Sequence, residues 1–284
     1  MTPNLRGSLF MTASMAGFAV EDAFLKQISQ SMPVGQVSAI FGFCGVVVFA
    51  LMALRAGHAP VPRAALTRTM AVRSVFEVTG RLFYALAIAM TPISTASAIL
   101  QATPLVVVLG AALIFGERVT LGRWALILIG FLGVLVILRP GVAGFSPLSV
   151  LALVAVAGFA GRDLATRAAP LGLSNAQLGV AGYVMLMVSG LIILGVTGGA
   201  VLPDARMMGL LALGAGFSIA AYAALTNAMR SGEVGVVTPF RYTRLLFAMV
   251  LGVTVFGERP DTATLIGAAI IVGCGVVLLA PRRR

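Results

Sequence analysis

The sequence predicts an all-α membrane protein in which ten transmembrane helices form two inverted five-helix repeats. Two observations carry this prediction: an extreme apolar composition, and a self-similarity at an offset of half the chain. Of the 284 residues, 60% are hydrophobic and only 10% are charged. A soluble domain carries about a quarter charged residues, so we expect most of the apolar surface to face lipid.

Ten apolar runs have the length of about 20 residues that a spanning helix needs. Prolines, glycines and charge clusters separate them. They cover residues 8–27, 34–54, 69–90, 93–115, 121–138, 147–166, 175–197, 207–229, 234–256 and 262–280. Because the predicted number of spans is even, both termini are expected on the same side of the membrane.

The basic residues predict which side that is. In this topology eleven Lys and Arg lie on the side of the termini, four on the opposite side and five inside the spans, which accounts for all 20. Basic residues concentrate on the cytoplasmic side of membrane proteins. We therefore expect a multi-pass protein of the bacterial inner membrane with both termini cytoplasmic. The scattered basic residues do not form the single patch that a nucleic-acid partner would require.

The two halves of the chain align without a gap at an offset of 141 residues. Ala16–Ala19 then matches Ala157–Ala160 in all four letters, and Gly116-Glu117-Arg118 matches Gly257-Glu258-Arg259. Each half, 1–141 and 142–284, contains five spans, an odd number, so the second copy must enter the membrane from the opposite face. Inverted repeats of this kind are typical of secondary transporters, whose sites lie near the midplane between the copies.

This layout resembles the drug/metabolite transporter superfamily, and within it the two-repeat EamA-type exporters of bacterial inner membranes. The residues that carry the resemblance are Phe115–Arg118 and Phe256–Arg259, each ending a Pro- and Gly-rich fourth helix of its repeat. The resemblance implies export of metabolites or amino acids, with aromatic amino acids as one class. It does not imply symmetric solute contacts, because Pro104 lies thirteen residues before Glu117 whereas Pro239 lies nineteen before Glu258.

Charged residues inside a span usually face a cavity or one another. In the third span Arg73, Glu77 and Arg81 recur at four-residue spacing and Tyr84 follows three later, so all four share one helical face. This face is open to two interpretations: an intrahelical ion ladder centred on Glu77, or a solute-binding surface. At the repeat offset Arg81 corresponds to Tyr222, which keeps the second copy polar but uncharged.

The fourth and ninth spans carry the other candidates for solute binding. Gln101 and Tyr242 correspond at the repeat offset, and an interhelical hydrogen bond is the alternative role for Gln101. Arg241 and Arg244 add two cations to the ninth span. We expect one of them to line the cavity and the other to pair or reach toward an interface. The predicted solute-binding set is Glu77, Arg81, Tyr84, Gln101, Tyr222, Tyr242 and Arg244.

Two pairs of residues are candidate gates or hinges. Asp22 and Asp163, in the first helix of each repeat, are predicted toward opposite sides of the membrane. They act either as gate or proton-binding carboxylates or as salt-bridge partners of Arg162, Lys26 or Arg167. Pro104 and Pro239 interrupt the fourth and ninth helices and provide either hinges or fixed kinks. Glu117 and Glu258, each at a helix end, are interpreted as structural turn residues.

The predicted function is a secondary transporter that exports small organic solutes, most directly amino acids, by alternating access. The alternatives are transport of anionic or nucleotide-type metabolites or drugs and, more remotely, a membrane enzyme or scaffold. No metal-ligand spacing, phosphate-binding loop or dinucleotide motif is found, so we expect no metal, no cofactor and no enzymatic activity. The expected partners are a small-molecule solute and membrane lipid. A complete two-repeat unit can enclose a cavity alone, which is compatible with a monomer.

Overall fold

The computed structural model describes residues 2–115, 120–138, 146–167, 172–231 and 237–279, and every regular element among them is a helix. The elements run in order α1 (Pro3–Ile28), α2 (Val34–Arg55), the short η1 (Arg63–Leu66), α3 (Arg68–Met90), α4 (Ile93–Leu100), α5 (Thr103–Phe115), α6 (Leu121–Leu138), α7 (Ser149–Arg167), α8 (Asn175–Thr197), α9 (Ala205–Ser231), η2 (Thr238–Tyr242), α11 (Thr243–Phe256) and α12 (Thr262–Leu279).

Each of the ten predicted spans overlaps a helical element in the described residues. By length and composition, four stretches are long and apolar enough to cross a membrane, namely Val34–Arg55, Ile93–Ile114, Asn175–Thr197 and Ala205–Ala228. Shorter apolar helices occur at Trp124–Ile137 and Thr262–Cys274. The distribution of polarity agrees with a lipid environment. Val196 and Leu113 are exposed at 84% and 72%, while Arg73 and Glu77 are buried inside the bundle.

The fourth predicted span, 93–115, is not one continuous helix but two, α4 and α5, separated at Gln101 and Ala102. The cause is Pro104, which has no amide hydrogen to donate to the carbonyl of Leu100 four residues earlier. The Thr103 hydroxyl donates to that carbonyl instead, at 2.6 Å. The break therefore leaves no unpaired carbonyl at Leu100.

The ninth predicted span is also interrupted, but differently. Pro239 lies in the first turn of η2, a 3-10 segment that leads directly into α11. A proline in a first turn costs no helical hydrogen bond. The interior hinge expected at Pro239 is therefore not found: its backbone begins a helical segment rather than interrupting one.

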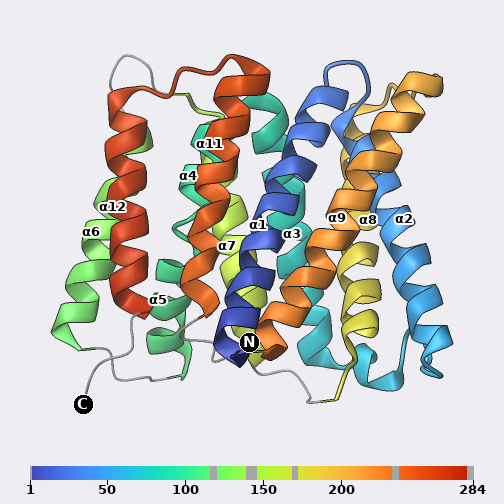
Figure 1. The fold of residues 1–284 in the computed structure, drawn as a ribbon, viewed down its shortest axis with the longest axis horizontal. Helices are drawn as coiled ribbons and strands as arrows, with labels where there is room; N and C mark the ends of the chain where they lie inside the picture. The colour runs from blue at the N-terminus through green and yellow to red at the C-terminus, as the bar shows by residue number, and fades with distance from the viewer. Residues whose placement is uncertain (1, 116–119, 139–145, 168–171, 232–236, 280–284) are drawn as a thin grey trace.

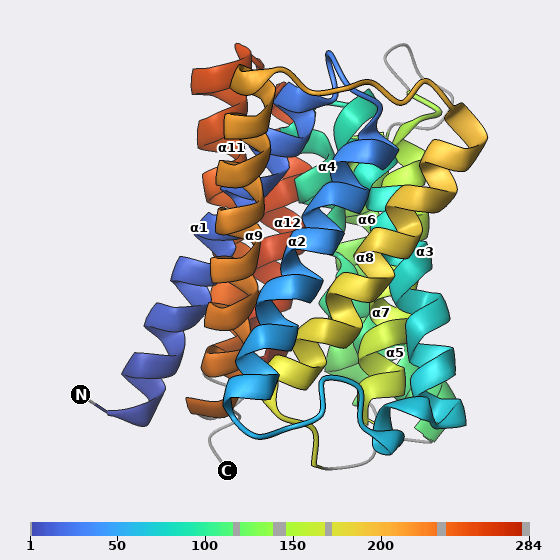
Figure 2. The ribbon, with the colours of Figure 1, turned by 90° about the vertical axis from the view of Figure 1, so that its right-hand side faces the viewer.

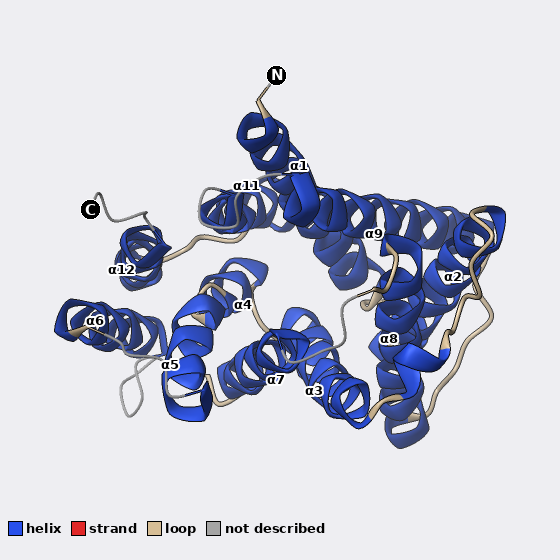
Figure 3. Ribbon diagram, turned by 90° about the horizontal axis from the view of Figure 1, so that it is seen from below, coloured by secondary structure: helices blue, strands red, loops and turns tan. Residues whose placement is uncertain are grey.

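The two halves of the chain pack against each other in a symmetric pattern. The most extensive contacts join α2 with α8, α1 with α9, α3 with α7, and α6 with α12. Exchanging each helix for its counterpart 141 residues away turns every one of these pairs into another pair of the same set. Seen along the bundle, α4, α5, α6, α11 and α12 form one side and α2, α8 and α9 the other, with α1, α3 and α7 between them (Figures 1 and 3).

Glycines allow the closest of these contacts, between α2 and α8, which cross each other in Figure 2. A methyl group added at Gly190 would overlap the backbone of Ala39 and the carbonyl of Gly35, and one added at Gly42 would overlap the backbone of Met187. Small residues permit such backbone approach in membrane helices. The α2–α8 contact holds one end of the bundle together and closes the central cavity on that side.

Candidate functional site

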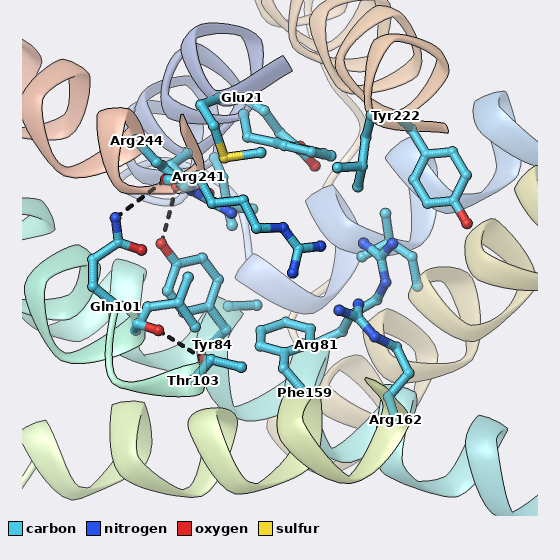
Figure 4. Close-up of a pocket in the computed structure, with 18 of the residues that line it drawn as sticks. Glu21, Arg81, Tyr84, Gln101, Thr103, Phe159, Arg162, Tyr222, Arg241 and Arg244 are labelled. Atoms are coloured by element: carbon cyan, nitrogen blue, oxygen red, sulfur yellow. Dashed lines mark hydrogen bonds and ion pairs between the residues drawn. The ribbon is translucent and has the colours of Figure 1, made fainter. Parts of the chain in front are cut away.

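A cavity of about 150 Å³ lies between the two halves of the chain and takes side chains from both. This volume holds several water molecules or part of a small solute, so the charges that line it need not be in dry protein. Figure 4 shows the lining residues converging from different helices. Its charged members are four arginines and three carboxylates, namely Arg81, Arg162, Arg241, Arg244, Glu21, Asp22 and Asp163.

Asp22 and Arg244 form a buried ion pair that links α1 with α11. The Arg244 Nη2 atom lies 2.7 Å from Asp22 Oδ2, and the Tyr84 hydroxyl of α3 donates to the same oxygen at 3.0 Å. The Arg244 guanidinium is held between two rings, 5.2 Å from the centroids of Phe18 and Tyr84. The partner of Asp22 is therefore an arginine 222 residues away and not Lys26, Arg162 or Arg167, as sequence proximity suggested.

Asp163 lines the same cavity as Asp22, whereas opposite sides of the membrane were expected. It accepts a hydrogen bond from Arg162 Nη2 at 2.8 Å, which is one of the predicted salt bridges. Arg241 Nη1 approaches its other oxygen at 3.7 Å. Arg241 and Arg244 thus both line the cavity and both pair with an aspartate. The expectation that only one of them lines it is wrong, because the turn of η2 directs the two side chains toward different aspartates.

Glu77 is buried in a cluster of arginines behind the cavity wall. Its carboxylate lies 3.0 Å from Arg73 Nη2 and 3.5 Å from Arg81 Nε, both on α3. Arg162 Nη1 of α7 lies 3.9 Å from it. Glu77 is not among the residues that line the cavity, whereas Arg81 is. The ion ladder is therefore present, and it extends to a second helix.

Gln101 and Tyr242 lie together where the two broken spans meet. Gln101 Nε2 donates to the backbone oxygens of Tyr242 and Arg241, at 3.2 and 3.3 Å. The interhelical hydrogen bond considered for Gln101 is thus present, and its side chain also lines the cavity. The Tyr242 hydroxyl is buried and has no hydrogen-bond partner in the part of the chain that the structure describes.

Tyr84 and Tyr222 contribute aromatic walls. The Tyr84 ring meets Phe159 edge-on, with centroids 6.1 Å apart. Tyr222 donates its hydroxyl to the Leu178 carbonyl at 3.1 Å and packs edge-on against Phe49 and Tyr183. Both rings line the cavity, but each hydroxyl is already bonded to protein.

Glu258 joins elements at one end of the bundle. Its carboxylate accepts hydrogen bonds from the backbone N–H of Ile93 at 2.7 Å and from the backbone and hydroxyl of Ser94, at 3.1 and 2.7 Å. Lys26 lies 3.5 Å away. A carboxylate at the start of α4 is favourably placed toward the helix dipole. Glu258 is thus structural, as expected, although it connects α11 to α4 and α1 and is not confined to its own turn. Its counterpart Glu117 lies outside the described residues.

Two of the predicted gate residues remain. Pro104 lines the cavity beside Gln101 and Thr103. The side chain of Pro239 lies outside the part of the chain that the structure describes. Among the lining residues, sequence reasoning did not select Glu21, Arg162 or Arg241 for binding. The signal for Glu21 and Arg162 was available, because they too correspond at the offset of 141 residues.

Comparison with known proteins identifies the family. The model of the EamA-like transporter family matches residues 5–139 and again 145–280. A solved crystal structure superposes with a TM-score of 0.60, covering 97% of both chains at 20% identity, which shows a common fold.

Curated relatives are named as transporters or exporters. The chain is 26% identical to the pseudopaline exporter CntI of Pseudomonas aeruginosa over 96% of its own length and 95% of that protein. It is 30% identical to a riboflavin transporter of Vibrio cholerae over 64% of this chain and 60% of that one. An S-adenosylmethionine uptake transporter of Rickettsia prowazekii is 22% identical over 75% of this chain and 72% of that one. The predicted resemblance is confirmed: the chain is a membrane transporter, not an enzyme, and belongs to the EamA-like family of the drug/metabolite transporter superfamily.

Proposed function

We propose that this protein is a secondary transporter that exports small carboxylate-bearing solutes, amino acids above all, from the bacterial cytoplasm. The observation that carries the proposal is the charge of the cavity: four arginines against three carboxylates, in a space between the two repeats. One cation in excess favours a solute that brings one negative charge. Guanidinium groups bind carboxylates in a bidentate geometry that adds specificity.

Arg241 and Arg81 are better placed than Arg244 to meet that carboxylate. Arg244 is engaged by Asp22 at 2.7 Å and enclosed by two rings. Arg241 meets Asp163 only at 3.7 Å, and Arg81 reaches Glu77 only through Nε at 3.5 Å. Both can therefore offer guanidinium N–H groups to a solute at small cost.

The aromatic walls favour a solute with an apolar or ring-bearing part. Phe18, Phe41, Tyr84, Phe159 and Tyr222 all line the cavity. Aromatic or other neutral amino acids are the first candidates. Nucleotide-type metabolites and drugs are the second, because relatives are named for riboflavin and S-adenosylmethionine, which both contain flat heterocycles.

The membrane arrangement that we propose has ten spans in two inverted repeats, 1–141 and 142–284, with both termini cytoplasmic. The start of α1 and the end of α12 lie at the same end of the bundle (Figure 1), which supports a common side. The basic residues support the cytoplasmic side. Alternating access follows from the fold, because the cavity lies between two halves that can change their relative arrangement.

Counterflow into proteoliposomes tests the function. The purified protein is expected to exchange at least one labelled amino acid against an internal pool, and phosphorylated nucleosides are tested in parallel. Arg241→Gln should reduce exchange about tenfold or more, as expected for loss of a charge-assisted bond. Arg206→Gln is the control, since Arg206 is exposed and outside the cavity.

The outcomes separate the two candidates. Exchange of nucleotides and none of amino acids selects the second candidate. If Arg241→Gln and Arg206→Gln both exchange at the wild-type rate, the excess cation in the cavity does not serve binding.

A further inference from the structure

The cavity is electrically asymmetric because of one residue pair at the repeat offset. Glu21 and Arg162 are 141 residues apart and precede Asp22 and Asp163, respectively. The first repeat therefore places two carboxylates side by side where the second repeat places an arginine beside a carboxylate. The charge of this position is reversed between the two copies.

The contacts of the two residues are related in the same way. Arg162 bonds Asp163 at 2.8 Å and lies 3.9 Å from Glu77. The residue 141 positions after Glu77 is Ser218 of α9, and Glu21 interacts with the hydroxyl of this serine. An ion pair in one half of the molecule is thus replaced by a carboxylate and a neutral hydroxyl in the other half.

Glu21 has no ionic partner in the described part of the chain, since no lysine or arginine there lies within 4.0 Å of it. The adjacent Asp22 takes Arg244, and consecutive helical residues point about 100° apart. Glu21 therefore faces α9 while Asp22 faces α11. A carboxylate inside a membrane protein is costly without a cation beside it. Because Glu21 lines the cavity (Figure 4), a solute can supply this cation.

A second polar group of the same cavity also lacks a partner. Ser38 of α2 is 1% exposed, its hydroxyl has no hydrogen bond in the described residues, and it lines the cavity. A hydroxyl oxygen accepts hydrogen bonds from an ammonium group. Phe41 and Tyr222 line the same cavity, and aromatic faces attract cations. These groups come from α2 and α9, on the side of the bundle opposite η2 and α11 (Figure 3).

We propose that Glu21 binds the cationic group of the transported solute, with Ser38 as an additional acceptor. The inference rests on the proposed function and names its substrate class: zwitterions that carry a protonated amine as well as a carboxylate. The carboxylate is bound by Arg241 and Arg81, and the ammonium by Glu21. This assigns to Glu21 the role that the sequence suggested for Glu77, whose carboxylate is enclosed by arginines.

Binding of matched ligands tests the proposal. The probes are three amino acids, L-phenylalanine, L-methionine and L-leucine, and the carboxylic acids that lack only their amino groups, including 3-phenylpropionate. Wild-type protein in detergent should bind at least one amino acid more tightly than its des-amino analogue by about tenfold or more. Glu21→Gln should abolish this preference and leave the Kd of the des-amino acid unchanged, which also shows that the variant is folded. Glu21→Asp should retain part of the preference.

Three results would overturn the inference. If Glu21→Gln weakens amino acid and des-amino acid equally, the side chain supports the cavity and does not recognise an amine. If the wild-type protein binds the two ligands equally, the substrate is a simple carboxylate and the proposed function survives without the zwitterion. If the wild-type protein binds none of the six probes and exchanges no amino acid, the proposed function fails and this inference fails with it.

Discussion

Gln101 and Tyr242 are 141 residues apart, the offset that aligns the two halves of the chain, and they are in direct contact. Gln101 Nε2 donates to the Tyr242 carbonyl at 3.2 Å. Gln101 is the C-cap of α4 and Tyr242 the N-cap of α11, so each marks the break of its span. Two equivalent positions can touch only near the axis that relates the halves. The broken spans therefore meet at the centre of the molecule, beside the cavity.

Replacing Gln101 with Leu should destabilise the protein. The substitution removes the donor to two backbone oxygens that no longer have helical partners. We expect a loss of about 1–2 kcal/mol, the range for interhelical hydrogen bonds in membrane proteins. Denaturant unfolding in mixed micelles measures it, and solute affinity should fall as well. Wild-type stability would show that water replaces the amide group.

Tyr242→Phe should behave in the opposite way. The Tyr242 hydroxyl has no hydrogen-bond partner in the described residues, so its removal should change stability by less than about 0.5 kcal/mol. Solute affinity should fall if this hydroxyl meets the substrate. Unchanged affinity, measured on the same preparation, would make Tyr242 a packing residue.

The sequence was sufficient to predict the helices because membrane thickness imposes a length and a composition on each of them. It predicted the break after Gln101 for the same local reason, since the effect of Pro104 extends only four residues. It could not predict that Arg244 would pair with Asp22, because that contact depends on how α1 and α11 pack across 222 residues. The same holds for Glu258, whose partners Ile93 and Ser94 belong to another helix.

For the site, hydropathy indicated which charges lie inside the bundle but not which of them face the cavity. Glu77 and Glu21 look alike as intramembrane carboxylates. The structure distinguishes them, because Glu77 is surrounded by Arg73, Arg81 and Arg162, whereas Glu21 faces the cavity. Pairing is decided by tertiary contacts between helices that are distant in sequence.

Asp22 and Arg244 should show strong energetic coupling. Asp22→Asn leaves the guanidinium without its carboxylate, and Arg244→Gln leaves the carboxylate without its cation. Breaking one side of a buried pair costs about 3–5 kcal/mol. The double variant should lose less than the two single losses combined, by about 0.5–3 kcal/mol. Unfolding of all four proteins under one condition measures the coupling, and additive losses would contradict a direct pair.

Two glycines of α8 should respond differently to the same substitution. At Gly190 an added methyl group would overlap the backbone of Ala39, whereas nothing lies within 4 Å of the corresponding position at Gly195. Gly190→Ala should therefore cost about 1–3 kcal/mol through overpacking. Gly195→Ala should be neutral or stabilising by up to about 1 kcal/mol, because alanine favours the helix. Melting temperatures of the detergent-solubilised proteins compare the two, and equal destabilisation would argue against close α2–α8 packing.

Pro104 should act as a hinge during transport, and this distinguishes it from Pro239. The break between α4 and α5 is compatible with movement because the Thr103 hydroxyl satisfies the Leu100 carbonyl without a helical N–H. Pro104→Ala restores that N–H and favours a continuous helix by up to about 3 kcal/mol. If alternating access requires the fourth span to bend at this position, the variant should transport more slowly while its solute Kd is unchanged.

Pro239→Ala is the matched control for Pro104→Ala, because Pro239 lies in the first turn of η2, where no helical hydrogen bond is at stake. Its transport rate should stay near the wild-type value. Proteoliposome exchange and equilibrium binding, measured for both variants, separate movement from recognition. Slowing by Pro104→Ala alone supports a hinge in the fourth span. Equal slowing by both variants would mean that the ninth span also bends, and normal exchange by both would leave the prolines as fixed kinks. A weakened Kd in Pro104→Ala would instead indicate that Pro104, which lines the cavity, shapes the binding site itself.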